Sequence, residues 1–327
     1  MMVEEASPLF GPEVCLFASE VLTKRIWALL DEIEGVRENR DPECLHRMRV
    51  ASRRLRNALS LFGGCFSEVE WKRWEKEARK VGRALGEARD ADVQAASVAA
   101  LLETVDDRKP RPGVERLLLR LRQRRERLQL KVIRALDRLE ESELKKSFPE
   151  ALRGLSARMR MALPGQAEGL ETVRGAAAEL LARRAAELEA FQPVADHPER
   201  VEELHAMRIA VKRLRYTLEI FRSLFQGEAD LVLETLKKLQ DLLGDVHDCD
   251  VWSTFLPQFL EKEERRTIRY FGHGRPMGRL RPGIEFLQAE FRKRRAERFE
   301  EFREFWKRNL DEVGWKAFAR RLGRNVP

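Results

Sequence analysis

Residues 45–56 read LHRMRVASRRLR, and residues 204–215 read LHAMRIAVKRLR. Over residues 45–66 and 204–225, eleven of the twenty-two positions are identical at a constant offset of 159. Apolar residues recur at helical spacing in both copies, so each copy is predicted to be an amphipathic helix. A repeated helix of this kind indicates an internal duplication.

The similarity continues on both sides of the repeated helix. The further matching pairs of segments are 20–25 and 179–184, 85–93 and 243–251, and, more loosely, 122–127 and 292–297. Helices are predicted at 13–36, 42–63, 67–104, 114–147, 169–191, 199–226, 229–264 and 284–311. Each copy of the duplicated unit therefore contains four helices.

The fold predicted from this pattern is all-α, because strand-like alternation is nearly absent. Two tandem four-helix bundles, related by the internal duplication, account for the order of the helices. The predicted divisions are 1–148 for the first repeat, 149–168 for a linker, 169–312 for the second repeat and 313–327 for a C-terminal tail.

The composition favours a globular protein outside the membrane. Of 327 residues, 63 are Lys or Arg and 55 are Asp or Glu, and 43% are hydrophobic, enough for a substantial core. No apolar run of about 18 residues is present, and MMVEEASPLF is unlike a secretory signal, so a cytoplasmic location with no membrane partner is expected. The four cysteines lack CxxC spacing, which argues against disulfides and a zinc site; all are expected to be reduced.

Each copy of the repeated helix has a cationic face opposite its apolar face. At about 100° per residue, His46, Arg49, Arg53 and Arg56 fall within a ribbon about 80° wide. Residues 44–66 contain no Asp or Glu, although a face built only for solubility would mix acids with bases. An uninterrupted row of like charges is locally unfavourable and indicates an anionic partner. The second copy repeats the ribbon with His205, Arg208, Lys212 and Arg215.

Arginine dominates both ribbons, and its planar fork engages two phosphate oxygens at once. Successive helical turns lie about 5.4 Å apart, so a ribbon can follow a linear phosphate polymer. Additional candidate ligands come from basic residues at matching places in the two halves. They are Lys24, Arg25, Arg79, Lys80, Arg83, Arg124, Arg125, Arg183, Arg184, Lys237, Lys238, Arg294 and Arg295.

These segments together resemble the CHAD domain, the conserved-histidine α-helical domain. The resemblance rests on LHxMRxxxRRLRxxLxxF, on LHxMRxxxKRLRxxLxxF and on LGxxxDxDV in each half, and it covers essentially the whole chain. It implies two four-helix bundles related by pseudo-twofold symmetry, with a basic surface or pore that binds inorganic polyphosphate. It also implies that His46 and His205 are the namesake histidines. The phosphate ligands that it implies are Arg49, Arg53, Arg54, Arg56, Arg208, Lys212, Arg213 and Arg215.

His46 and His205 have three interpretations. Each can hydrogen-bond to phosphate, pack between helices, or take part in metal or phosphohistidine chemistry. The arginines on the same helix face repel a metal ion, which favours the first interpretation, and no cofactor is expected. A bound polyanion is expected to raise the pKa of both imidazoles.

Two aspartates are preserved in each LGxxxDxDV segment. The neighbouring His247 and Cys249 have no counterpart in the first half, which argues against a ligand cluster there. The aspartates are predicted to orient basic side chains in a fork that is preset for phosphate. A divalent ion that bridges them to phosphate is an open alternative. The four residues are Asp90, Asp92, Asp248 and Asp250.

The segment EVEWK at 68–72 matches an ExExK pattern that the CYTH triphosphate-tunnel enzymes carry on a barrel strand. Here it is predicted to start a helix, and a stand-alone domain without CYTH is expected. No Walker loop, nucleophile elbow or nucleophile–base pair is readable, so no enzymatic activity is expected.

The leading hypothesis is a non-catalytic module that binds long-chain polyphosphate and associates with polyphosphate granules. Nucleic-acid binding is the second hypothesis, although the ribbons lack aromatic residues to stack bases. The third is a metal-dependent phosphohydrolase or phosphotransferase that uses the paired histidines and aspartates. The loop at 271–283 has no counterpart in the first half and is either an ordinary connection or a lid. The residues that a lid would bring to the anion are His273, Arg275, Arg279 and Arg281.

Overall fold

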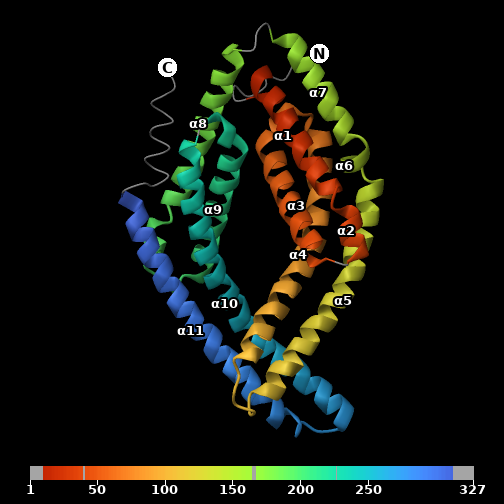
Figure 1. Cartoon of the computed structure of the whole chain (residues 1–327), viewed down its shortest axis with the longest axis vertical. Coiled ribbons are helices and arrows are strands. Elements are labelled where there is room, and N and C mark those ends of the chain that lie inside the picture. The colour runs from red at the N-terminus through yellow and green to blue at the C-terminus, as the bar shows by residue number, and fades with distance from the viewer. Residues whose placement is uncertain (1–9, 40, 164–166, 226, 312–327) are drawn as a thin grey trace.

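The structure is a computed structural model that describes residues 10–39, 41–163, 167–225 and 227–311. These residues form helices joined by short turns and include no strand, so the all-α prediction is confirmed (Figure 1). The predicted tail at 313–327 lies outside the described residues. The α-helices are α1 (Pro12–Leu30), α2 (Ile33–Glu38), α3 (Pro42–Phe62), α4 (Glu68–Glu103), α5 (Arg111–Glu141), α6 (Glu143–Lys146), α7 (Phe148–Ala162), α8 (Ala167–Glu189), α9 (Val201–Phe221), α10 (Glu228–Phe271) and α11 (Met277–Asp311). Short 3-10 turns are η1 (Gly63–Cys65), η2 (Gln192–Val194) and η3 (Arg222–Leu224).

Polar side chains cap the helices that carry the first ribbon and its neighbour. At the start of α3, Asp41 accepts a hydrogen bond from the backbone N–H of Glu43 at 2.9 Å. At the start of α4, the Ser67 hydroxyl donates to the Glu70 carboxylate at 2.6 Å and accepts from its N–H at 3.4 Å. The ExExK-like segment at 68–72 is therefore the first turn of a capped helix, as expected.

Turns interrupt two of the predicted helices. The helix predicted at 13–36 is divided at Asp31 into α1 and α2, and the helix predicted at 114–147 is divided at Ser142 into α5 and α6. Buried apolar residues continue on both sides of each turn, so hydrophobic spacing alone does not reveal the interruption.

Residues 149–168, predicted to be a linker, are largely helical. Helix α7 occupies most of this segment, and α8 begins at Ala167. Phe148 and Leu152 of α7 are buried, and the helix packs against α1 (Figure 1). The connection between the two halves is therefore part of the core.

Two separate hydrophobic cores hold the halves together. The larger combines residues of α1, α3, α4 and α7 with residues of α8, α9, α10 and α11. Within it, Phe17 of α1 and Phe62 of α3 pack on Phe221 of α9, with centroid distances of 5.5 and 6.1 Å. The smaller core lies where α4 and α5 meet α10 and α11, and there Trp252 stacks on Phe291 at 4.7 Å. The halves thus meet at both ends of the molecule.

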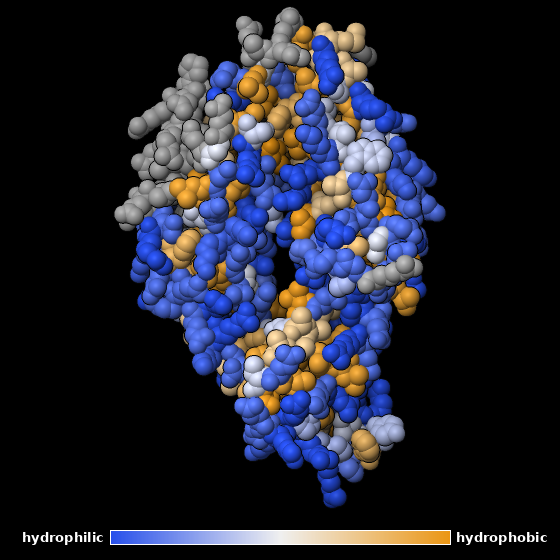
Figure 2. Space-filling view, viewed as in Figure 1, coloured by the Kyte–Doolittle hydropathy of each residue, from blue (hydrophilic) through white to orange (hydrophobic). Residues whose placement is uncertain are grey.

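Between the two cores the halves separate. Figure 1 shows α3 and α9 on opposite sides of this region. Figure 2 shows an opening through the molecule at the same level, bordered on both sides by hydrophilic residues. The two helices that carry the ribbons therefore face the part of the molecule that the cores leave open.

Helices α5 and α11 cross at two glycines in the smaller core. A Cβ on Gly113 would lie 2.1 Å from the backbone oxygen of Leu280, and a Cβ on Gly283 would lie 2.2 Å from that of Pro110. Such distances are far below van der Waals contact, so only glycine permits this approach of the two backbones.

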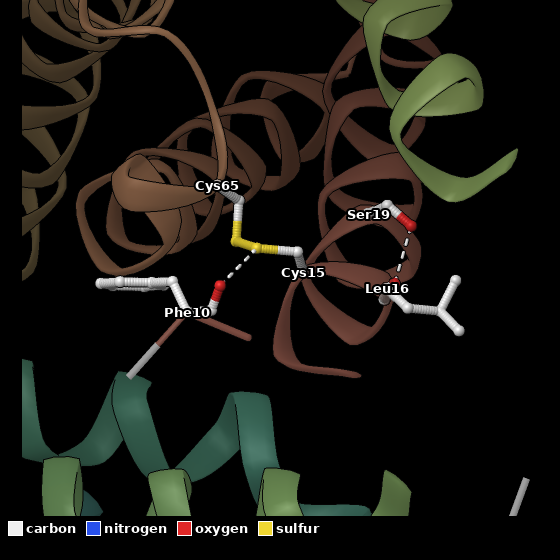
Figure 3. Close-up of a disulfide and its surroundings, with 5 residues drawn as sticks. All are labelled: Phe10, Cys15, Leu16, Ser19 and Cys65. Atoms are coloured by element: carbon white, nitrogen blue, oxygen red, sulfur yellow. Dashed lines mark hydrogen bonds between the residues drawn. A yellow bond between two sulfur atoms is a disulfide. The ribbon is translucent and has the colours of Figure 1, made fainter. Parts of the chain in front are cut away.

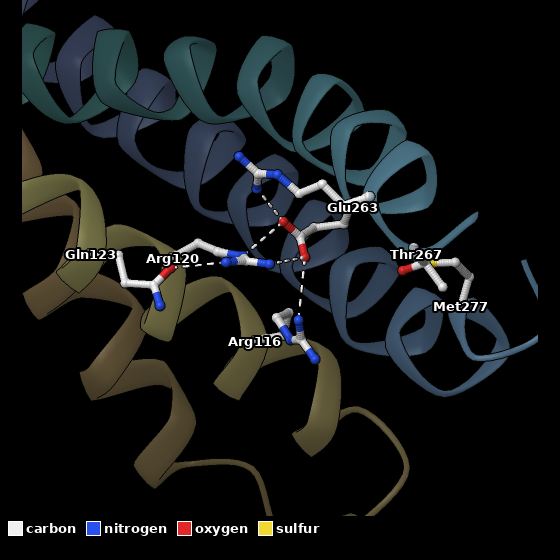
Figure 4. A network of polar contacts seen from close by, with 7 residues as sticks. Arg116, Arg120, Gln123, Glu263, Thr267 and Met277 are labelled. Atoms are coloured by element: carbon white, nitrogen blue, oxygen red, sulfur yellow. Dashed lines mark hydrogen bonds and ion pairs between the residues drawn. The ribbon is translucent and has the colours of Figure 1, made fainter. Parts of the chain in front are cut away.

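A buried carboxylate links the halves near the same end of the molecule. Glu263 of α10 has 1% of its side chain exposed and accepts hydrogen bonds from Arg120 of α5 at 2.9 and 3.2 Å (Figure 4). Arg116 of α5 lies 3.5 Å from one carboxylate oxygen, and Arg266 of α10 completes the network. Three cations around one carboxylate compensate for its burial.

The segment at 271–283 does not reach the ribbons. Helix α10 continues to Phe271, and α11 already begins at Met277, so only a short turn joins them. This turn lies at the end of the molecule beyond the smaller core, far from α3 and α9 (Figure 1). The lid interpretation is therefore wrong for His273, Arg275, Arg279 and Arg281.

The expectation that all four cysteines are reduced is also wrong. Cys15 of α1 and Cys65 of η1 form a disulfide, with Cα atoms 5.4 Å apart (Figure 3). Fifty residues separate the two in sequence, and spacing alone does not reveal that the fold brings them together. Cys44 and Cys249 are free. The disulfide fastens the start of α1 to the turn after α3.

Loss of this disulfide is expected to destabilise the protein without changing its fold. The crosslink spans 50 residues and restricts the unfolded chain, which stabilises the folded state by about 2–4 kcal/mol. A Cys15→Ser/Cys65→Ser variant should therefore unfold at a lower urea concentration, as followed by circular dichroism. Cys44→Ser is the matched control, because Cys44 is free. An equal decrease in the urea midpoint of the Cys44→Ser variant and of the double variant would contradict the prediction.

Candidate functional site

The two ribbons bring cations of α3 and α9 close together. Arg49 and Arg53 of α3 lie near Arg208 and Lys212 of α9, and their charges affect one another. Burial lowers the pKa of Lys212 to about 7, with further lowering by the three arginines. The site thus concentrates more positive charge than its own carboxylates compensate.

The central arginine of each half is placed in the same way. Arg49 Nε lies 3.9 Å from the position of a Cβ on Gly86, and Arg208 Nε lies 3.8 Å from that of a Cβ on Gly244. The two guanidinium groups therefore pack at contact distance over equivalent glycines, on α4 and α10. Both Nε atoms are buried without a hydrogen-bond partner among the described residues. A bound anion would satisfy such donors.

The first aspartate of each LGxxxDxDV segment lies beside these arginines. Asp90 of α4 accepts a hydrogen bond from Arg49 Nη2 at 2.8 Å. Burial lowers the pKa of Arg208, and the charge of Asp248 on α10 raises it in part. The charge of Asp90 also raises the pKa of both Arg208 and Asp248. Asp90 therefore orients Arg49, and carboxylates from both halves act electrostatically on the cations at one place.

The second aspartate of each segment binds an arginine within its own half. Asp92 accepts a hydrogen bond from Arg125 at 2.8 Å, and Asp250 accepts one from Arg295 at 2.5 Å. Each arginine also donates to a second acceptor on another element. The structure therefore places Arg125 and Arg295 in internal ion pairs and not in the central cluster.

The namesake histidines have different neighbours in the two halves. Burial and the charge of Arg89 lower the pKa of His46. His205 Nδ1 lies 3.1 Å from Nδ1 of His247, which takes the position equivalent to Arg89. Burial, Arg208 and His205 lower the pKa of His247 to about 4. The second half thus carries a neutral histidine where the first carries a cation.

Tyr216 of α9 contacts cations of both ribbons. The guanidinium carbon of Arg53 lies 4.9 Å from the ring centroid, and that of Arg215 lies 5.7 Å from it. Glu219, one turn later, accepts hydrogen bonds at 3.1 Å from Arg54 of α3 and from Arg215. The carboxylate therefore joins α3 to α9 and compensates two of the predicted ligands.

The remaining predicted ligands lie elsewhere along the helices. Burial and the charges of Arg79 and Arg83 lower the pKa of Arg56. Burial and the charge of Arg54 lower the pKa of Arg25. Ion pairs or hydrogen bonds join Arg79 to Glu75, Arg183 to Glu179, Arg184 to Glu187, Lys238 to Glu301, Arg124 to Gln94 and Arg294 to Asp245. The exposed residues are Lys24, Lys80, Arg83, Arg213 and Lys237, and also Arg56, Arg79, Arg183, Lys238 and Arg294.

The sequence-based interpretation missed Tyr216, Glu219 and Arg89, and it set His247 aside. Their common property is that the two halves differ at these positions. A search for residues preserved by the duplication therefore passes over them. Comparing positions 57 and 216, where Asn replaces Tyr, would have identified an aromatic residue on the cationic helix.

Two further observations concern metal and membrane binding. Within the described residues, no group of three or more histidine, cysteine, aspartate or glutamate side chains is arranged to hold a metal ion. None of the helices in the described ranges is long and apolar enough to cross a membrane.

Comparisons with known proteins match this architecture. The structure is similar to the crystal structure of the CHAD domain from the plant Ricinus communis, with 23% identity, a TM-score of 0.61, and coverage of 89% of this chain and 91% of that one. It is also similar to PptA from Streptomyces chartreusis, with 16% identity, a TM-score of 0.58, and coverage of 90% and 99%. No curated protein sequence matches the chain. The family model of the CHAD domain matches residues 20–257, which is most of the sequence, and the chain therefore belongs to the CHAD domain family.

Proposed function

We propose that this protein binds inorganic polyphosphate, without catalysis, through the cationic cluster between its two halves. The observation that carries the proposal is the convergence of Arg49 and Arg53 with Arg208 and Lys212, from helices on opposite sides of the opening. A linear phosphate polymer carries charge along its whole length and compensates several cations at once. The resemblance of the LHxMR segments to the CHAD domain supports the same ligand.

The unpartnered donors suit such a ligand. Arg49 Nε and Arg208 Nε are buried N–H groups without acceptors among the described residues, and Asp90 accepts a hydrogen bond from Nη2 of Arg49. A guanidinium held in this way loses little conformational freedom when it binds phosphate. His46 and His205 lie on the same helices and add imidazole donors.

A binding role is favoured over catalysis by the placement of the carboxylates. Asp90, Asp92 and Asp250 each accept a hydrogen bond from an arginine, which holds these carboxylates in ion pairs and disfavours their use as a general base or as metal ligands. Nucleic acid is a poorer ligand for this cluster, because arginines already contact the Tyr216 ring. Association with polyphosphate granules in the cytoplasm is part of the proposal.

Calorimetric titration with long-chain polyphosphate tests the proposal. We expect binding that persists after EDTA treatment, that weakens steeply with salt because several counterions are released, and that leaves the chain length unchanged on a gel. Single-stranded RNA should not displace the polymer from the cluster. Absence of binding, or shortening of the polymer, would overturn the proposal.

Binding is expected to take up protons near neutral pH. The pKa of Lys212 is about 7 in the free protein, and those of His46 and His205 are lowered by burial and by neighbouring cations. A bound polyanion favours the charged forms and raises these pKa values. Affinity should therefore decrease as the pH rises from about 6 to about 9.

Titrations in buffers of different ionisation enthalpy measure this proton uptake directly. Lys212→Arg is the matched variant, because arginine keeps the charge at every pH in the range. It should take up fewer protons than the parent protein while still binding polyphosphate. Unchanged uptake in this variant would show that Lys212 is not the titrating group.

A further inference from the structure

A second basic surface lies at the tip of the α10–α11 pair, defined as residues 265–281. The tip contains no Asp or Glu. It lies beyond the smaller core, at the opposite end of the molecule from both ends of the described chain (Figure 1). It also lies outside residues 20–257, which match the family model. Its basic residues are Arg265, Arg266, Arg269, Arg275, Arg279 and Arg281.

Half of these cations have no ion pair within the described part of the chain. Ion pairs join Arg265 to Glu261, Arg266 to Glu263 and Arg281 to Glu264. In contrast, Arg269, Arg275 and Arg279 are exposed, and no carboxylate of the described residues pairs with them. Three unpaired cations around one turn indicate an anionic partner.

Aromatic side chains are exposed among these cations. Tyr270 is 83% exposed and Phe271 is 55% exposed, and their rings meet edge to face at 4.8 Å. The rings of Phe271 and His273 are nearly parallel, with an angle of 21° and centroids 6.4 Å apart. Gly272 lies between these two residues, and its φ of 76° is a left-handed conformation that turns the chain here.

The separation of Phe271 and His273 suits a planar ligand. Stacked bases lie about 3.4 Å apart, so a base between two rings needs about twice that distance. The two centroids are 6.4 Å apart, and both side chains are exposed and free to shift so that a base can stack on either ring. The turn itself is anchored, since the Thr267 hydroxyl lies 3.4 Å from the sulfur of Met277 (Figure 4).

We propose that the tip binds single-stranded nucleic acid. The bases would stack on Phe271, His273 and Tyr270, and the phosphates would contact the unpaired arginines. Bare polyphosphate has no aromatic face, so the exposed rings would contribute nothing to its binding. A duplex hides its base faces from the same rings. The site is separate from the cluster between the halves and does not depend on the function proposed for it.

Fluorescence anisotropy of a labelled 12-nucleotide oligouridylate with the full chain tests the proposal. We expect a Tyr270→Ala/Phe271→Ala variant to lose about tenfold or more in affinity, because stacking contributes for each base. Trp27→Ala is the matched control, since Trp27 is 49% exposed on α1 and lies away from the tip. It should bind like the parent protein, and a 12-base-pair duplex should bind about tenfold more weakly.

The central cluster provides a second control. An Arg49→Glu/Lys212→Glu variant, altered only between the halves, should bind oligouridylate as the parent does. Three results would overturn the proposal: loss of oligouridylate binding in this variant, equal affinity for the duplex, or tip-dependent binding to phosphatidylserine vesicles without binding of the oligonucleotide.

Discussion

An Arg49→Glu/Lys212→Glu variant is expected to lose at least about a hundredfold in polyphosphate affinity while it remains folded. Arg49 lies on α3 and Lys212 on α9, so the variant loses one cation from each helix that lines the cluster. Each charge-assisted contact contributes about 1.5–3 kcal/mol, and losing two corresponds to about a hundredfold or more. The variant should stay folded, because the buried apolar faces of α3 and α9 are unchanged. It loses both the Arg49–Asp90 hydrogen bond and the cation repulsion that adds to burial in lowering the pKa of Lys212 to about 7.

The matched control is Lys72→Glu/Arg153→Glu, which changes the net charge equally. Both side chains are largely exposed, on α4 and α7, and neither belongs to the ribbons. Calorimetry should show a change of no more than about threefold for this pair, since surface charges are screened at moderate salt. Equal weakening by the two double variants would mean that net charge, and not the cluster, determines the affinity.

Gly283→Ala is expected to destabilise the protein by about 3 kcal/mol or more. The added Cβ would lie 2.2 Å from the backbone oxygen of Pro110 and 2.7 Å from Cα of Gly113. Backbone atoms on a packed helix cannot move aside as a flexible side chain can, so α5 and α11 must separate and the smaller core must open. Urea denaturation followed by circular dichroism measures the loss.

Gly278→Ala is the control on the same helix. A Cβ there would meet no atom within 4 Å, and alanine is the better helix former, so stability should rise by about 0.5–1 kcal/mol. If the two variants unfold at the same urea concentration, the close crossing of α5 and α11 does not exist in solution.

The repeated segments predict the helices at the centre of the molecule because their two faces are so different. Met48 and Leu55 of α3 are fully buried, while Arg49 and Arg53 on the other face lie in the cluster. The helical period and the charge pattern together therefore predicted which side of α3 and of α9 is buried and which side is cationic. The aspartate motif in turn led to Asp90, which binds Arg49.

Other features depend on contacts between distant segments. The Cys15–Cys65 disulfide and the burial of α7 against α1 are set by packing and have no local signature. The ribbons also do not reveal which of their arginines the protein itself compensates. Glu219 engages Arg215, for example, and the residue equivalent to Glu219 in the first half is Ser60.

The contacts at both ends of the molecule have a topological consequence. Phe221 closes one end through Phe17 and Phe62, and the crossing of Gly113 with Gly283 closes the other, so the opening between them has no gap in its circumference. Under the proposed function, a polymer that passes through this opening enters by a free end. To dissociate, the threaded polymer must then slide through the opening until one of its ends leaves it. Residence time will therefore grow with the length of the polymer, even though the number of contacts in the opening stays the same.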